Sequence, residues 1–119
     1  IEYPMKGSAN IIWRSIGTPQ GLSPWFADRV EAIGKVYNFY WGKTEQRKAT
    51  LVAQRNGVYV RFKWEDEEPH SFFEMRITYN ELVMQHMLEV TDFADKDEID
   101  DIKNLWDSQI EQLRRHTGM

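Results

Sequence analysis

Residues 97–116 decide the fold, and they read DEIDDIKNLWDSQIEQLRRH. Along this stretch the apolar side chains recur at the spacing of one helix face: Ile99, Ile102, Trp106, Ile110 and Leu113. Acidic residues crowd the first turns and basic residues the last, a polarity that complements the helix dipole. Gly118 is a natural helix stop. The pattern predicts one long amphipathic helix from about Lys96 to His116.

Before this helix, from about Asp28 to Phe93, the apolar residues recur with a period of two, which is typical of strands buried on one face. In the clearest strand Val58, Val60, Phe62 and Trp64 alternate with polar or amphipathic residues, after a tight-turn signal at Asn56-Gly57. Short connections between successive strands favour an antiparallel meander. In the other predicted strands, the residues expected to face the core are Tyr37, Phe39 and Trp41; Ala49, Leu51 and Ala53; Phe73, Met75, Ile77 and Tyr79; and Met84, His86, Leu88, Val90 and Asp92.

The N-terminal part begins with a β-like stretch over residues 1–5 and continues with two short helices. Ser8 is a plausible N-cap for a helix over residues 9–16, and Thr18-Pro19 starts a second one. Leu22, Trp25 and Phe26 would form the apolar face of that second helix.

Together these elements predict an α+β helix-grip fold, in one domain over residues 1–119. A curved antiparallel sheet would wrap around the long C-terminal helix, with two short helices after the first strand. Such a geometry leaves a cavity between sheet and helix unless large side chains fill it. Small residues at Ala49 and Ala53 would leave room below the helix, and the short helix with Trp25 and Phe26 would close one mouth.

Composition narrows the classes of function. The 119 residues are 41% apolar and 13% aromatic, enough for a packed core. A net charge of −4 repels phosphate backbones, so nucleic acid is not an expected partner. The absence of cysteine excludes disulfides, thiolate metal sites and a cysteine nucleophile. No apolar run approaches the ~20 residues that span a bilayer, and we expect a cytoplasmic location.

Patterns of catalytic and metal-binding residues are lacking. His70, His86 and His116 do not have the spacing of metal ligands. There is no glycine-rich phosphate loop and no Ser-His-Asp arrangement with supporting context. The acidic residues 66–68 are typical of a solvated hairpin turn rather than of paired catalytic carboxylates. We therefore expect no enzyme activity, no metal and no cofactor.

Five stretches, taken in order, resemble a known family. They are TPQGLSPWF (18–26), YNFYW (37–41), VRFKW (60–64), LEVTDF (88–93) and the helix from Leu105 to Leu113. The chain resembles the START-like, or SRPBCC, superfamily, which includes the birch pollen allergen. Within it, the chain is most similar to the branch of the activator of the heat-shock ATPase chaperone, and to small START-like proteins of Bacteroidetes. Many relatives carry a His-x-Gly-Phe pattern where this chain has Asp92-Phe93, so the role of that histidine cannot be carried over.

The resemblance implies a hydrophobic cavity for lipids, sterols, polyketides or hormones, in a family that also contains a few enzymes and a co-chaperone. The residues predicted to line the ligand site are Trp25, Phe39, Trp41, Ala53, Phe62, Trp64, Met75, His86 and Trp106. Plain core packing is the alternative for most of the aromatic ones. His86 and Asp92 would fix the polar head of a ligand; otherwise His86 is an interior or outward-facing imidazole, and Asp92 caps the last helix.

We therefore predict non-enzymatic binding of a small hydrophobic, lipid-like molecule between the sheet and the C-terminal helix. The alternative is a co-chaperone-like interaction module with a filled core and a protein partner. A basic stripe on the outer sheet face, formed by Lys48, Arg61, Lys63 and Arg76, keeps this alternative open. A cyclase or dehydratase ranks third, because only His86 with Asp92 offers an acid–base pair.

Overall fold

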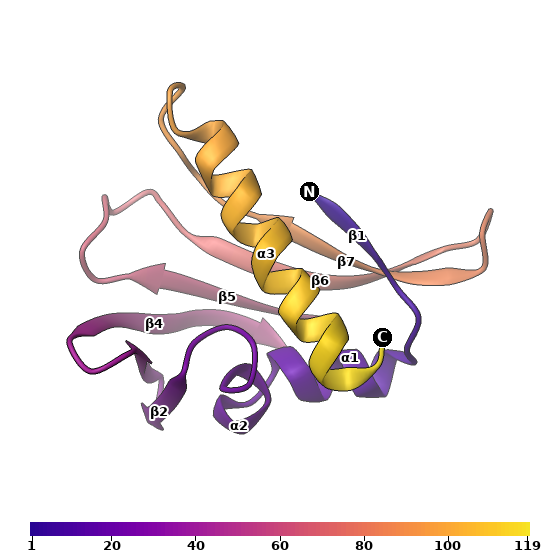
Figure 1. Cartoon of the computed structure of the whole chain (residues 1–119), viewed down its shortest axis with the longest axis horizontal. Helices are drawn as coiled ribbons and strands as arrows, with labels where there is room; N and C mark the ends of the chain where they lie inside the picture. The colour runs from indigo at the N-terminus through magenta and orange to yellow at the C-terminus, as the bar shows by residue number, and fades with distance from the viewer.

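The computed structural model describes residues 1–119 and confirms the α+β helix-grip architecture. Seven strands form one antiparallel sheet in the order β1-β7-β6-β5-β4-β3-β2. The elements are β1 (Glu2–Met5), α1 (Ala9–Ile16), α2 (Pro19–Leu22), β2 (Arg29–Ile33), β3 (Val36–Trp41), β4 (Glu45–Arg55), β5 (Tyr59–Trp64), β6 (Phe73–Asn80), β7 (Gln85–Thr91) and α3 (Ile99–Thr117). Figure 1 shows α3 crossing the face of the curved sheet, with α1 and α2 at its C-terminal end.

Helix α3 begins at Ile99, three residues later than the sequence predicted. Its N-cap residue, Glu98, makes no capping hydrogen bond through its side chain. At the other end Gly118 adopts a left-handed φ of 77°, and its N–H donates to the carbonyl of Arg114 at 2.8 Å. The hydroxyl of Tyr3 donates to Asp107 at 2.7 Å, which ties the helix to β1.

The caps of both short helices are where the sequence placed them. The Ser8 hydroxyl accepts from the N–H of Ile11 at 3.3 Å, and the Thr18 hydroxyl accepts from that of Gly21 at 2.9 Å. A Cβ at position 21 would lie 1.7 Å from the carbonyl oxygen of Arg14, so only glycine lets α2 pack this closely against α1. Helix α2 ends at Leu22, so the prediction that Trp25 and Phe26 belong to its apolar face is wrong, and residues 23–28 form an irregular segment.

A β-bulge in β4 corrects the predicted position of Ala53. Leu51 pairs with the inward-facing Phe62, but Ala53 pairs with the outward-facing Arg61. The extra residue, Val52, shifts the alternation of side chains by one position, so Ala53 lies on the outer face of the sheet. The expectation that Ala53 leaves room on the concave face is therefore wrong, whereas Ala49 is fully buried.

Strands β6 and β7 continue past β5 as a two-stranded arm, residues 78–86, which projects from the body (Figure 1). Its tip is apolar and exposed: Leu82 has 95% of its surface accessible and Met84 79%. Met84 also has a left-handed φ of 53°, which is uncommon for a bulky residue. Tyr79, predicted to face the core, is half exposed on this arm. Met84 and Tyr79 therefore lie outside the core, because the helices do not cover the arm.

Candidate functional site

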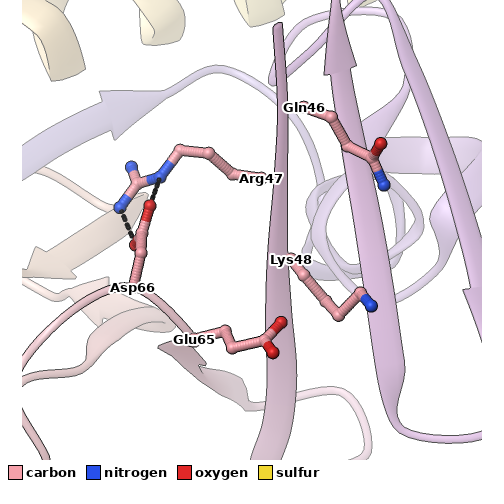
Figure 2. Close-up of a pocket in the computed structure, with 5 residues that line it drawn as sticks. All are labelled: Gln46, Arg47, Lys48, Glu65 and Asp66. Atoms are coloured by element: carbon pink, nitrogen blue, oxygen red, sulfur yellow. Dashed lines mark hydrogen bonds and ion pairs between the residues drawn. The ribbon is translucent and has the colours of Figure 1, made fainter.

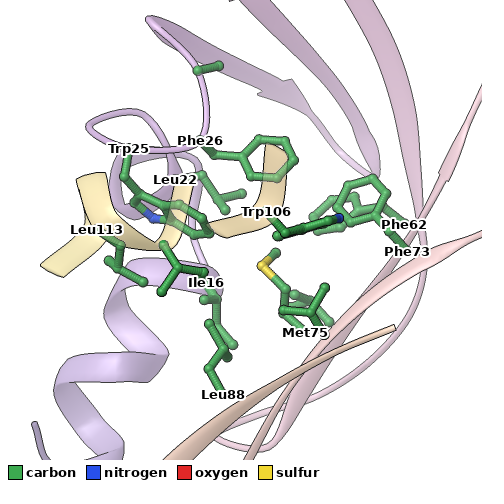
Figure 3. Packing of buried hydrophobic residues seen from close by; sticks show 14 of the residues in the cluster. Ile16, Leu22, Trp25, Phe26, Phe62, Phe73, Met75, Leu88, Trp106 and Leu113 are labelled. Carbon is green, nitrogen blue, oxygen red and sulfur yellow. The ribbon is translucent and has the colours of Figure 1, made fainter. Parts of the chain in front are cut away.

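Large side chains fill the predicted ligand space between the sheet and α3. At its centre lies Phe26, whose ring centroid is 5.1 Å from that of Phe39, 6.4 Å from Trp64, 5.5 Å from Phe73 and 5.7 Å from Trp106. We call these five residues the aromatic chamber; Figure 3 labels three of them, Phe26, Phe73 and Trp106. The side chain expected to close the mouth of a cavity instead occupies the middle of this space.

Two side chains from different elements hold the backbone of Phe26. The indole N–H of Trp41, on β3, donates to the Phe26 carbonyl at 3.2 Å. The amide of Gln109, on α3, donates to the same oxygen at 3.2 Å. Next to it the indole of Trp25 donates to the Ser15 carbonyl on α1 at 3.0 Å. Residues 23–28 are thus held by these side-chain donors together with the backbone bonds of a turn, in which the N–H groups of Trp25 and Phe26 donate to the Leu22 carbonyl at 3.3 and 2.9 Å.

The structure brings together seven of the nine predicted site residues and separates two. Those around the core are Trp25, Phe39, Trp41, Phe62, Trp64, Met75 and Trp106. Ala53 lies on the outer face, and His86 lies on the β6–β7 arm, where its ring packs edge-on against Tyr79 at 4.9 Å. His86 lies on the predicted face of β7, because it shares that face with the buried Leu88. It is, however, six residues before Asp92 in the chain. These two residues form no acid–base pair.

An apolar groove of about 400 Å³ opens between the end of β7 and the first turns of α3. We call it the β7–α3 groove. Its lining is mostly apolar, with Asp92 and Lys103 as its charged members: Ile1, Val90, Thr91, Asp92, Phe93, Ala94, Ile99, Ile102 and Lys103. Val90 is buried and Ile102 packs on the core, so the groove lies directly against the interior.

Asp92 joins the groove to the aromatic chamber. Its carboxylate accepts from the indole N–H of Trp106 at 2.8 Å and from the backbone N–H of Phe93 at 2.7 Å. Burial raises the pKa of Asp92, and these two hydrogen bonds offset only part of that rise. Its two oxygens accept from Phe93 and Trp106, and the N-cap position of α3 is Glu98. Asp92 therefore does not cap α3, which was one of the alternatives that the sequence left open.

Arg47 is a polar residue on the concave face that the sequence analysis did not single out. It pairs with the buried Phe39, so it faces inward, and its guanidinium lies 3.8 Å from the ring centre of Trp64. It also donates to Asp66 at 2.8 and 3.0 Å (Figure 2). A further bond runs from Arg47 to Glu67 at 3.2 Å. Hydrogen bonding to Arg47 lowers the pKa of Asp66. The sequence contained a signal for this position, because Arg47 lies two residues before Ala49 and continues the inward-facing alternation of Ala49 and Leu51.

On the outer face, an ion-pair cluster interrupts the predicted basic stripe. Glu74 is buried, and its carboxylate accepts from Arg61 at 2.8 and 3.0 Å and from Arg76 at 3.3 Å. Burial favours the neutral carboxyl, but hydrogen bonds and charge from the two arginines outweigh it, so the pKa of Glu74 is lowered. Two of the four cations in the stripe are thus already paired.

The geometry offers neither a metal cluster nor a membrane-spanning helix. No three His, Cys, Asp or Glu side chains lie together in a way that could hold a metal ion. None of the helices is both long enough and apolar enough to cross a membrane.

Comparison with known proteins agrees with the fold. A family model for the START-like superfamily domain matches residues 1–119. A Bacteroides fragilis protein solved by NMR is 48% identical over 98% of this chain and 87% of its own, with a TM-score of 0.65. Aha1 of Colwellia psychrerythraea, solved as a dimer, is 13% identical over 95% of this chain and 90% of its own, with a TM-score of 0.76.

A Bacillus thuringiensis protein reaches a TM-score of 0.79 at 12% identity, over 100% of this chain and 97% of its own. These last two likenesses concern the fold alone. Among curated proteins, none matches the chain. The family model and the Bacteroides relative confirm the resemblance seen in the sequence: the chain belongs to the START-like superfamily.

Proposed function

We propose that this protein binds a small apolar molecule that carries a hydroxyl head, without chemical conversion, in the β7–α3 groove. The observation that carries the proposal is an apolar groove of about 400 Å³ with a partly buried carboxyl at its floor. Ligand sites are typically concave and mostly apolar, with a few polar groups that orient the ligand, and span roughly 300–1,000 Å³. Membership of a superfamily whose fold commonly binds ligands supports the same class of function.

The polar contact would come from Asp92. Each of its oxygens accepts one protein donor, from Phe93 or from Trp106, and retains a second lone pair. A ligand hydroxyl can use that capacity, while its apolar body covers Val90 and Ile102. The ligand class is therefore a medium-length alcohol or a hydroxylated ring system.

A displacement titration tests this site. A fluorescent naphthalene probe is bound to the protein and displaced by 1-decanol, in the wild type and in Ile99→Lys. Ile99 lines the groove and is 42% exposed, so a lysine there blocks the groove with little effect on folding. We expect saturable binding that weakens at least tenfold in Ile99→Lys. The matched control is Leu105→Lys, on the same helix and 54% exposed but outside the groove; equal binding by both variants would contradict the proposal.

The filled aromatic chamber favours a second candidate, an interaction module that works through its surface. The exposed apolar tip of the β6–β7 arm, residues 82–84, is the feature that such a module would use. The same titration separates the two candidates. If the wild type binds no probe up to the solubility limit, the interaction module becomes the better candidate.

A further inference from the structure

We propose that the β6–β7 arm is a second binding surface, and that its tip, residues 81–84, inserts into the surface of a lipid bilayer. This goes beyond the proposed function and does not depend on it. The β7–α3 groove begins at Val90, at one end of β7, whereas the tip lies beyond Gln85, at the other end (Figure 1). The two surfaces are therefore separate and can be tested separately.

The tip of the arm exposes apolar side chains that the rest of the molecule does not cover. Leu82 has 95% of its surface accessible, Met84 79% and Val83 60%. Met84 also holds a left-handed φ of 53°, a conformation that is strained for a bulky residue and that occurs preferentially at functional sites. Contiguous apolar exposure is unfavourable in water, so the tip gains free energy when another surface covers it.

Below the tip, the residue types change in an order that follows the depth profile of a membrane interface. The neutral amides Asn80 and Gln85 form the first cross-strand pair. Tyr79 and His86 form the second, with their rings edge-on at 4.9 Å and half of the Tyr79 surface exposed. Tyrosine is enriched at the headgroup level of membranes. At about 3.3 Å per residue the tip extends about 10 Å beyond these rings, which matches the depth that interfacial segments reach.

The arm also carries little charge. Glu81 is the only Asp, Glu, Lys or Arg among residues 78–86, whereas these four types make up 29% of the chain. Removing an ionised side chain from water is costly, so a segment with few of them leaves water most easily. Without a Lys or Arg on the arm, and with a net charge of −4, attraction to anionic headgroups does not drive the binding. The arm therefore fits a zwitterionic lipid surface.

The small size of the tip favours a lipid surface over a protein partner. Its apolar part is three side chains at the end of a two-stranded ribbon, whereas a stable protein interface uses roughly 20–30 residues on each side. The strands behind the tip add polar amides rather than further apolar surface. A bilayer needs no complementary pocket, and each apolar side chain that inserts contributes on its own.

Co-sedimentation of the full chain with sucrose-loaded phosphatidylcholine vesicles tests the proposal. We expect the wild type to sediment with the vesicles, and Leu82→Asp to weaken this partitioning about tenfold or more, because it replaces an inserted apolar side chain by a charge. The matched control is Ile33→Asp on β2, which is 83% exposed but lies outside the arm, and it should sediment like the wild type. Adding about 30% phosphatidylserine should not strengthen the binding.

A second measurement locates the contact. In NMR spectra of the full chain with bicelles that contain a spin-labelled lipid, the amide signals of residues 82–84 should broaden. Those of the exposed turns at Gly34 and Gly57 should not. Both aspartate variants alter exposed positions and are expected to fold, which their melting temperatures check.

Several outcomes would overturn the proposal: no sedimentation of the wild type, an equal loss in both aspartate variants, or binding that requires phosphatidylserine. A dimer that forms without lipid and that Leu82→Asp dissociates, seen by sedimentation velocity, would assign the tip to a second copy of the chain instead. The groove is tested independently, because Ile99→Lys should still sediment with the vesicles and Leu82→Asp should still bind the naphthalene probe. Loss of sedimentation in Ile99→Lys would place the lipid contact at the groove and overturn the role of the arm.

Discussion

Each face of the sheet holds one shielded carboxylate, Glu74 buried on the outer face and Asp92 partly buried on the concave face, and the surroundings shift the two pKa values in opposite directions. On the outer face Glu74 is enclosed by two arginines that donate at 2.8 to 3.3 Å, and its pKa is lowered. On the concave face Asp92 accepts only from an indole and a backbone N–H, and its pKa is raised. The nearby cation, Arg47, donates to Asp66 and Glu67 instead.

This difference bears on which carboxylate could contact the proposed ligand. The Glu74 carboxylate is taken up by arginine donors and only 7% of the side chain is exposed, so it links Arg61 on β5 to Arg76 on β6. Asp92 has only neutral donors and borders an apolar groove, so a ligand can still gain from contacting it. A partly buried acid without a paired cation is thus the feature that distinguishes the concave face from the outer face.

Removal of Trp106 should have the largest effect, because the concave face depends on it. Trp106→Ala deletes a ring that contacts Phe26 and Phe73 and leaves Asp92 without its indole donor. We expect a loss of roughly 3–5 kcal/mol in the free energy of unfolding, measured with urea. Leu105→Ala, next to it and 54% exposed, should cost less than about 0.5 kcal/mol. Similar losses in the free energy of unfolding for both variants would mean that α3 does not turn Trp106 toward the sheet.

A matched pair of alanines tests the register that separates the two faces. Ala49→Leu adds volume to a fully buried position and should cost roughly 1–3 kcal/mol through overpacking. Ala53→Leu lies beyond the bulge on the outer face, and should change stability by less than about 0.5 kcal/mol. Urea unfolding of both variants decides the question, and equal destabilisation would mean that β4 has no bulge at Val52.

The cluster on the outer face should contribute less than the core. Glu74→Gln leaves Arg61 and Arg76 beside each other without a counter-charge, and we expect a loss of about 1–2 kcal/mol. This is below the range for fully buried pairs, because 37% and 33% of the two arginine side chains are exposed to solvent. Glu31→Gln, which breaks the exposed pair with Arg29, is the control and should be nearly neutral. A loss no larger than that of the control would assign Glu74 no structural role.

The sequence was sufficient to predict the fold, because period-two strands and a helical stripe can be recognised without long-range information. Ser8, Thr18 and Gly118 have local signatures, and the helix boundaries they predict agree with the structure. The bulge at Val52 has no such signature, since it depends on how β4 pairs with β5. Because of this one inserted residue, the sequence pattern assigned Ala53 to the wrong face of the sheet.

The candidate site was harder to predict, because its parts come from segments far apart in the chain. Aromatic periodicity correctly indicated Phe39, Trp64 and Trp106 as neighbours. It could not show that Phe26, from an irregular segment, would fill the space between them. Gln109 is on α3, 83 residues from its acceptor, so its role appears only in three dimensions.

The smallest effect is also the most direct test of the comparison, because Asp92 and Glu74 should give stability a pH dependence of opposite sign. The folded-state pKa of Asp92 is raised, so the folded protein binds more protons than the unfolded chain from about pH 3.9 up to that raised value. Stability therefore falls as the pH rises through this window. For Glu74, with a lowered pKa, stability is lost as the pH falls below the unfolded value of about 4.3.

Asp92→Asn removes the titration while keeping the size of the side chain. One of its two acceptors becomes a donor, so a fixed loss below about 1 kcal/mol is expected at every pH. On top of this, the difference between variant and wild type should shift in favour of the variant as the pH rises from about 3.9 through the raised pKa of Asp92, and then stay constant. Urea unfolding at several pH values measures it, with Glu74→Gln as the counterpart of opposite slope. A difference independent of pH would mean that Asp92 is solvated, and the groove would then lose its buried acid.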